Sequence, residues 1–164
     1  ATGGLAGCAA SGSGPAPAAS SAAGPTSADN PFGLAANSST EAVIFKGGYG
    51  IEYAEFAGKA MQTKDAGSTV KVDAATNIAQ TLQPRFVAGN PPDVIDNSGA
   101  GLIGINTIRE QLADLTDVIN ANNYEGTKIA DTLYPGVTAP GTFDGKFVQL
   151  NCGVRSSPAP QRSV

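Results

Sequence analysis

The sequence predicts an α/β domain in which a mainly parallel sheet is flanked by helices, confined to residues 41–151 of the 164-residue chain. Short apolar runs alternate with amphipathic segments through this region, the pattern of strand, helix and strand units. Residues 9–40 are mostly Ala, Gly, Ser and Pro, so we expect a disordered linker there. After Asn151 the periodicity stops. The folded part is therefore a small domain or an incomplete larger one.

The first expected unit is a strand, a helix and a second strand. Residues 42–45 form a compact apolar run ended by two glycines, which indicates a buried strand. A helix is expected over residues 52–62. Its apolar face would contain Tyr53, Phe56, Ala57, Ala60 and Met61. Residues 69–72 alternate and are rich in β-branched side chains, which favours a second strand.

A second helix follows in the pattern. It is marked by three large apolar residues spaced four apart, Ile78, Leu82 and Phe86. Asn77 or Thr76 is expected to cap its start. Pro84 lies inside the pattern, and proline removes a helical hydrogen bond. We therefore expect either a kink at Pro84 or a helix that begins late.

The remaining elements are shorter. A third strand is expected at residues 93–96, after a Gly-Asn-Pro-Pro stop, and it leads into a polar loop at residues 97–99. A helical stretch is expected over residues 104–112, with one more turn around residues 115–119. Residues 143–150 contain an Asp-Gly pair, which predicts a tight turn that feeds a strand.

Composition excludes several classes of function. The net charge is −4 and the ten Lys and Arg residues are scattered singly, so nucleic acid is not an expected partner. The chain contains no histidine, so it cannot assemble a Ser/His/Asp or Cys/His nucleophilic unit. No Cys/His cluster or spaced acidic loop predicts a metal, and no cofactor is expected. No apolar stretch is long enough to span a bilayer, so a membrane link would need another device.

Two polar loops are expected at the carboxyl ends of the first and third strands, where open α/β sheets bind their ligands. The candidate ligand-binding residues are Gly48, Tyr49, Gly50, Asp96, Asn97 and Ser98. Backbone amides at a helix start favour polar ligand groups, short carboxylate and amide side chains can bridge sugar hydroxyls, and Tyr49 can offer an aromatic face. The alternatives are a plain glycine turn for the first loop and turn-forming roles for Asp96 and Asn97.

Paired carboxylates could also indicate a glycosidase, because two acids suffice for that chemistry. The acids considered are Glu52, Glu55, Asp93 and Asp96. Glu55 lies along the predicted first helix, and Asp93 begins a strand, where capping or backbone bonding is the usual role. The pattern therefore favours binding over catalysis, and no catalytic residue is predicted.

The first eight residues end in Leu5-Ala6-Gly7-Cys8 and precede the Ala/Ser/Gly/Pro stretch. This resembles the lipobox of a bacterial lipoprotein signal peptide, in which the cysteine becomes the lipid-modified first residue. A buried or free Cys8 is the alternative. Because a lipidated Cys8 has no free thiol, we expect no disulfide with Cys152.

Four segments in this order resemble the extracellular solute-binding proteins of ABC sugar importers. They are the Leu-Ala-Gly-Cys end, residues 43–49, residues 86–95 and residues 143–147. In that family an Ala-Gly-x-x-Pro-Asp-Val segment leads the third strand of the first lobe. An x-Asp-Gly-Lys-x-Tyr-Gly-x-Pro segment carries the chain toward the second lobe. Here Phe147 replaces the usual Tyr of that segment, and Leu150-Asn151 replaces the usual Pro.

Residues 93–101 are most similar to the receptors for N-acetylglucosamine and its β-1,4 dimer, N,N'-diacetylchitobiose, from high-GC Gram-positive bacteria. The resemblance implies a two-lobed, periplasmic-binding-protein-like fold, of which residues 41–151 are an incomplete first lobe. It also implies a lipid-anchored protein on the extracellular face of the cell membrane, which captures a sugar or short oligosaccharide and delivers it to ABC permease subunits. Because the two lobes hold the ligand between them, we expect this truncated chain to bind sugar negligibly.

Two other functions stay open, a surface glycoside hydrolase-like enzyme and a small structural surface lipoprotein. Residues 152–164 do not match the family pattern and hold two of the four arginines. Translation in a shifted frame and a natural disordered tail are both compatible with this segment.

Overall fold

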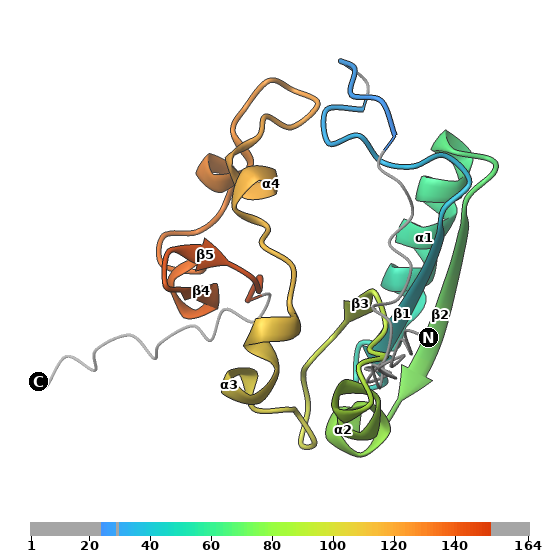
Figure 1. Ribbon diagram of the computed structural model, residues 1–164, viewed down its shortest axis with the longest axis vertical. Helices are drawn as coiled ribbons and strands as arrows, with labels where there is room; N and C mark the ends of the chain where they lie inside the picture. The colour runs from blue at the N-terminus through green and yellow to red at the C-terminus, as the bar shows by residue number, and fades with distance from the viewer. Residues whose placement is uncertain (1–23, 29, 152–164) are drawn as a thin grey trace, which may run out of the picture. The chain divides into compact units, whose positions relative to one another are not determined.

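The computed structural model describes residues 24–28 and 30–151. It divides the chain into two compact units with a boundary after Gly104. The predicted lipobox with Cys8, the first part of the linker, Cys152 and the tail at residues 152–164 lie outside the described residues. Figure 1 labels helices and strands of both units and colours the chain by residue number.

The segment before the sheet is held by hydrogen bonds to its own backbone. The Asn30 side chain accepts the Leu34 N–H at 2.8 Å and donates to the Leu34 carbonyl at 2.9 Å. The Gly24 N–H donates to the Gly33 carbonyl at 2.7 Å. Strand β1 then begins at Ser39, within the last residues of the predicted linker.

The first unit contains a parallel three-stranded sheet. Its strands are β1 (Ser39–Phe45), β2 (Thr69–Ala75) and β3 (Val94–Ile95), in the order β2-β1-β3. All three predicted strands are present, and the α/β class with a parallel sheet is confirmed. The central strand β1 buries Ala42, Val43 and Ile44, as its continuous apolar run predicts.

Helix α1 (Glu52–Lys64) is present, but its predicted apolar face is wrong. Tyr53 is 51% exposed and Phe56 is 75% exposed. The one fully buried residue of α1 is Gly58, and a β-carbon built at Gly58 would lie 3.0 Å from Val70 Cγ1 of β2. The helix approaches the sheet through this small residue, which leaves Tyr53 and Phe56 exposed, whereas Met61 is half-buried.

Helix α2 (Ile78–Val87) confirms its prediction. Ile78, Leu82 and Phe86 are buried, and the Asn77 side chain caps the helix by accepting the Gln80 N–H at 2.9 Å. Because Pro84 lies within a helix that starts at the predicted cap, the alternative of a late start is wrong.

The two helices cover opposite faces of the sheet. Gly58 of α1 meets Val70 of β2, whereas Arg85 of α2 binds Glu41 of β1. Glu41 is in register with Lys71, the neighbour of Val70, and successive residues of a strand point to opposite faces. The prediction of a sheet flanked by helices is therefore confirmed.

The second unit consists of short elements. They are α3 (Ile105–Ile108), η1 (Arg109–Gln111), α4 (Thr116–Asn120), η2 (Ile129–Thr132), η3 (Ala139–Gly141), β4 (Thr142–Phe143) and β5 (Lys146–Phe147). Ile108, Ile119 and Phe147 are its buried hydrophobic residues within the described chain. The predicted helix over residues 104–112 is shorter, because it is divided between α3 and η1.

The predicted Asp-Gly turn joins β4 and β5. Asp144 has a φ of 49° and Gly145 a φ of 81°, the left-handed conformations that a two-residue hairpin turn needs. The strand after the turn ends at Phe147, so the strand prediction through residue 150 is too long. In the part of the chain that the structure describes, no helix is long and apolar enough to cross a membrane.

Candidate functional site

The loops after β1 and β3 meet at one edge of the first unit's sheet, because these strands are parallel neighbours. From β1 the chain continues to β2 on one side, whereas β3 lies on the other side. Such a reversal of strand order is where open α/β sheets bind ligands. We name this region the carboxyl-edge surface. It comprises the six predicted residues Gly48, Tyr49, Gly50, Asp96, Asn97 and Ser98, together with Tyr53.

Phe45 packs between the two loops of the carboxyl-edge surface. A β-carbon at Gly47, in the loop after β1, would collide with the Phe45 ring. A β-carbon at Gly99, in the loop after β3, would collide with the same ring. Glycine at both positions lets the loops close on Phe45, a contact that the sequence prediction of a simple strand end misses.

Tyr53 and Asp96 connect the two sides of this edge. The Tyr53 hydroxyl, in the first turn of α1, donates to Asp96 Oδ2 at 2.9 Å. The Asp96 backbone N–H donates to the Val43 carbonyl at 3.0 Å and continues the pairing of β3 with β1. Asp96 is therefore fixed at the strand end while its carboxylate stays half-buried. The spacing of the helix predicts Tyr53 on its apolar face and does not indicate this contact.

Asn97 is turned toward its own loop. Its amide nitrogen donates to the Ile103 carbonyl at 2.8 Å, and its amide oxygen accepts the Ile103 N–H at 2.7 Å. This pair closes the loop of residues 97–103. The arrangement matches the turn-forming alternative for Asn97.

The loop after β1 presents an aromatic side chain to solvent. Tyr49 is 95% exposed. Gly50 has a φ of 67°, which favours glycine. Next to it, the Glu52 carboxylate accepts the Ile51 N–H at 2.9 Å, at the start of α1. Tyr49 thus stays accessible on a loop whose turn is set by Gly50 and whose helix start is stabilised by an acidic residue.

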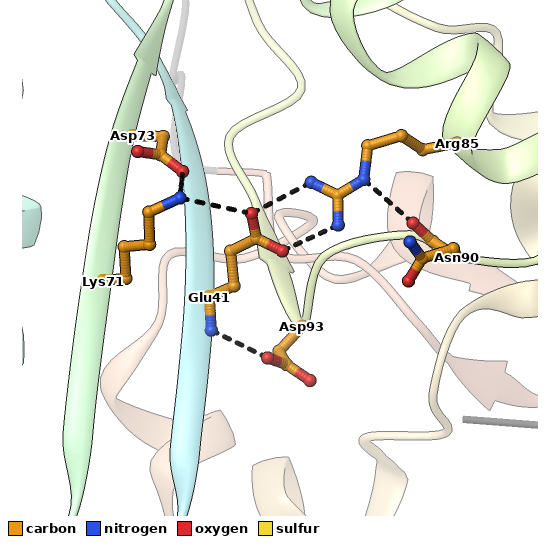
Figure 2. Close-up of polar contacts among 6 residues, drawn as sticks. All are labelled: Glu41, Lys71, Asp73, Arg85, Asn90 and Asp93. Carbon is orange, nitrogen blue, oxygen red and sulfur yellow. Dashed lines mark hydrogen bonds and ion pairs between the residues drawn. The ribbon is translucent and has the colours of Figure 1, made fainter. Parts of the chain in front are cut away.

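A second polar cluster joins all three strands to α2 (Figure 2). The Arg85 guanidinium donates to both Glu41 carboxylate oxygens, at 2.7 and 3.0 Å. The Arg85 Nε also donates to the Asn90 carbonyl at 2.9 Å. Asp93 accepts the Glu41 N–H at 2.7 Å, which links β1 to the start of β3. Lys71 of β2 lies 3.9 Å from the Glu41 carboxylate.

This cluster shifts the ionisation of its members. The hydrogen bonds from Arg85 hold the pKa of Glu41 below its ordinary value, and Glu41 in turn raises the pKa of Arg85. Asp73, which accepts from Lys71 at 2.6 Å, raises the pKa of Lys71. All of these shifts favour the charged forms, so the cluster stabilises the fold as a set of paired ions.

The acids considered for a glycosidase do not form one group. Asp93 and Asp96 lie at opposite ends of β3, separated by about 10 Å of strand. Asp93 binds the backbone of β1, and Glu52 binds the backbone at the start of α1. Asp93 thus has the backbone-bonding role that its position at the start of a strand predicts.

Each unit contains one hollow that is lined by residues outside the carboxyl-edge surface. One, of about 260 Å³, lies between α1 and β2 and is lined by Glu55, Gly58, Lys59, Gln62, Val70 and Val72. The other, of about 190 Å³, belongs to the second unit and includes Arg109, Phe143 and Asp144 among its lining residues. The residues of the carboxyl-edge surface line neither of these two hollows. The described chain also contains no cluster of three or more acidic, Cys or His residues that could hold a metal.

No protein-family model matches the chain. It is 55% identical over 128 residues to the diacetylchitobiose binding protein NgcE of Streptomyces coelicolor. The matched segment is 78% of this chain and falls in the N-terminal part of that relative, of which it covers 27%. The resemblance to sugar-binding receptors, inferred from four short segments, is thus confirmed over most of the chain. The relative is a binding protein by name.

Proposed function

From this shared ancestry, we propose that the chain forms one wall of the sugar site of an ABC importer's receptor. The ligand is an N-acetylglucosamine-type sugar, with N,N'-diacetylchitobiose as first choice. One observation carries the proposal: the 55% identity to a diacetylchitobiose binding protein. In this role the protein captures its ligand and makes or breaks no bond.

The chemistry of the carboxyl-edge surface supports this ligand class. Asp96 supplies a carboxylate that can accept from sugar hydroxyls or from an acetamido N–H. Tyr49, almost fully exposed, supplies a ring for the apolar face of a pyranose. Asn97 contributes by shaping the loop, since Ile103 engages both ends of its amide. Gly48, Gly50 and Ser98 complete the surface with backbone and hydroxyl groups.

The proposed site requires residues beyond this chain, which spans 27% of the relative's length. A ligand held between two lobes contacts both of them, and an open single wall leaves most of the sugar in water. The chain alone is accordingly proposed to bind sugar negligibly.

The proposed location is the extracellular face of the cell membrane, with a lipid on Cys8 as the anchor and permease subunits as partners. The Leu-Ala-Gly-Cys sequence and the small-residue stretch after it support the anchor. Mass spectrometry of the mature protein from its own cells tests this point, because an unmodified Cys8 that keeps the residues before it would contradict it.

The function is tested by titration calorimetry of a chimera. Residues 1–151 replace the matched N-terminal part of the Streptomyces relative, and the rest of the relative follows. We expect saturable binding of diacetylchitobiose by the chimera, and no saturable heat from the 164-residue chain.

A maltose titration and a hydrolysis assay complete the test. Maltose is the control sugar, and binding of maltose in preference to diacetylchitobiose would overturn the proposed ligand class. Hydrolysis of a chromogenic N-acetylglucosaminide by the chimera would instead support the hydrolase alternative. A folded chimera that binds none of the sugars contradicts the proposed function.

A further inference from the structure

We propose that Tyr53 is a positioning residue of the sugar site, which holds the Asp96 carboxylate so that its remaining acceptor capacity serves the ligand. This inference rests on the proposed function. The chemistry recognised is a hydroxyl or amide N–H donor on a neutral sugar.

The hydrogen bond between Tyr53 and Asp96 joins two distant parts of the chain. Tyr53 lies in the first turn of α1 and Asp96 follows β3, 43 residues later, with 2.9 Å between the hydroxyl and Oδ2. The hydrogen bond therefore joins the loop side of β1 to the loop side of β3, across the place where the strand order reverses. A sugar that rests on this edge would meet Asp96 with one oxygen already oriented.

The carboxylates of Asp96 and Glu41 differ in the donor that binds them. Both Glu41 oxygens accept from the Arg85 guanidinium. In this bidentate ion pair the positive charge of Arg85 compensates the negative charge of Glu41. Tyr53 is a neutral donor with a single hydrogen, and in the described part of the chain no salt bridge reaches Asp96. A carboxylate offers about four acceptor positions, and one phenol fills one of them. The Asp96 carboxylate can therefore accept further hydrogen bonds from a ligand.

The exposure of Tyr53 also supports a role at the surface. Tyr53 is 51% exposed although it belongs to a helix that packs on the sheet. A residue needed only for packing would be expected on the Gly58 side of α1, which faces Val70. Tyr53 instead lies beside the other residues of the carboxyl-edge surface, where its hydroxyl meets Asp96.

The test is a double-mutant cycle on the chimera, with Tyr53→Phe, Asp96→Asn and the pair of substitutions. We expect Tyr53→Phe to weaken diacetylchitobiose binding about tenfold, the size of a lost hydrogen bond to a charged group. If Tyr53 acts through Asp96, it should have little further effect once Asp96 is replaced. A purely structural residue would instead lower the melting temperature and give additive losses.

Tyr124→Phe is the matched control, because it removes a phenol hydroxyl from a residue that is 94% exposed in the second unit. It should leave the affinity unchanged. Wild-type affinity in the Tyr53→Phe chimera, or additive losses in the cycle, overturns the role of Tyr53 while leaving the proposed function intact. Failure of the unsubstituted chimera to bind is a failure of the proposed function itself.

Discussion

The carboxylate of Glu41 receives two hydrogen bonds from the Arg85 guanidinium, at 2.7 and 3.0 Å, whereas that of Asp96 receives one from the Tyr53 phenol. The donor determines what each acid can do. A guanidinium neutralises the charge of its partner and engages both oxygens. A phenol orients the carboxylate and leaves the charge in place. Glu41 therefore stabilises the sheet, whereas Asp96 is proposed to bind a ligand.

Replacement of Glu41 by Gln tests the stabilising role. At neutral pH we expect the free energy of unfolding of the 164-residue chain to fall by about 1–2 kcal/mol, because a charge-assisted bidentate pair is lost. Urea unfolding followed by circular dichroism measures the change. Glu125→Gln, at an exposed loop position, is the control and should have almost no effect.

The same pair predicts a pH dependence. Arg85 holds the pKa of Glu41 below its ordinary value of 4.5, so the folded state binds this proton less readily than the unfolded chain. The contribution of Glu41 is complete above 4.5 and is lost as the pH falls through the lower, folded-state value. The stability gap between wild type and Glu41→Gln should close in this acidic range. A gap that stays constant there contradicts the pairing.

At the scale of elements, α1 and α2 show where the sequence is informative. In α2 the large apolar residues at intervals of four are buried and Asn77 caps the start, as predicted. In α1 the spacing of the large residues also predicts that they face the sheet, but Gly58 makes the contact with Val70. A large side chain is buried only where the helix lies far enough from the sheet to leave room for it. The separation of α1 from the sheet is a tertiary property, which the periodicity of the α1 sequence does not contain.

Gly58→Val tests the close approach of α1. The added side chain would collide with Val70, so we expect the free energy of unfolding to fall by about 1–3 kcal/mol. Ala57→Val, at the exposed neighbouring position of the same helix, should cost only the lower helix propensity, about 0.5 kcal/mol. Helix propensity alone would make Gly58→Val slightly stabilising, because Gly is a poorer helix former than Val, so a Gly58→Val variant as stable as the wild type contradicts the close approach. Thermal and urea unfolding of both variants make the comparison.

Some features of the candidate site could be predicted from the sequence and others could not. The two loops could be placed at one edge from the sequence, because parallel strands end on the same side of a sheet. The Tyr53 contact with Asp96 and the packing of Phe45 between Gly47 and Gly99 could not be predicted. Both join residues more than 40 positions apart, so they depend on how the helix and the loops are set against one another.

At the scale of the whole molecule, the matched segment covers 27% of the length of a diacetylchitobiose binding protein. The described residues form a three-stranded parallel sheet and a second unit of short elements. One wall of a site gives a ligand few simultaneous contacts, and affinity in two-lobed receptors depends on enclosure. The net charge of −4 agrees with a neutral or weakly basic ligand better than with an anionic one.

The most direct test of the central claim is a crystal structure of the chimera with bound diacetylchitobiose. We predict that the sugar lies on the carboxyl-edge surface, with a sugar hydroxyl or acetamido N–H donating to Asp96 and a pyranose face against Tyr49. Tyr53 should keep its hydrogen bond to Asp96 in the complex. A sugar bound elsewhere, for example in the hollow beside Arg109 and Phe143, would contradict the assignment of the site.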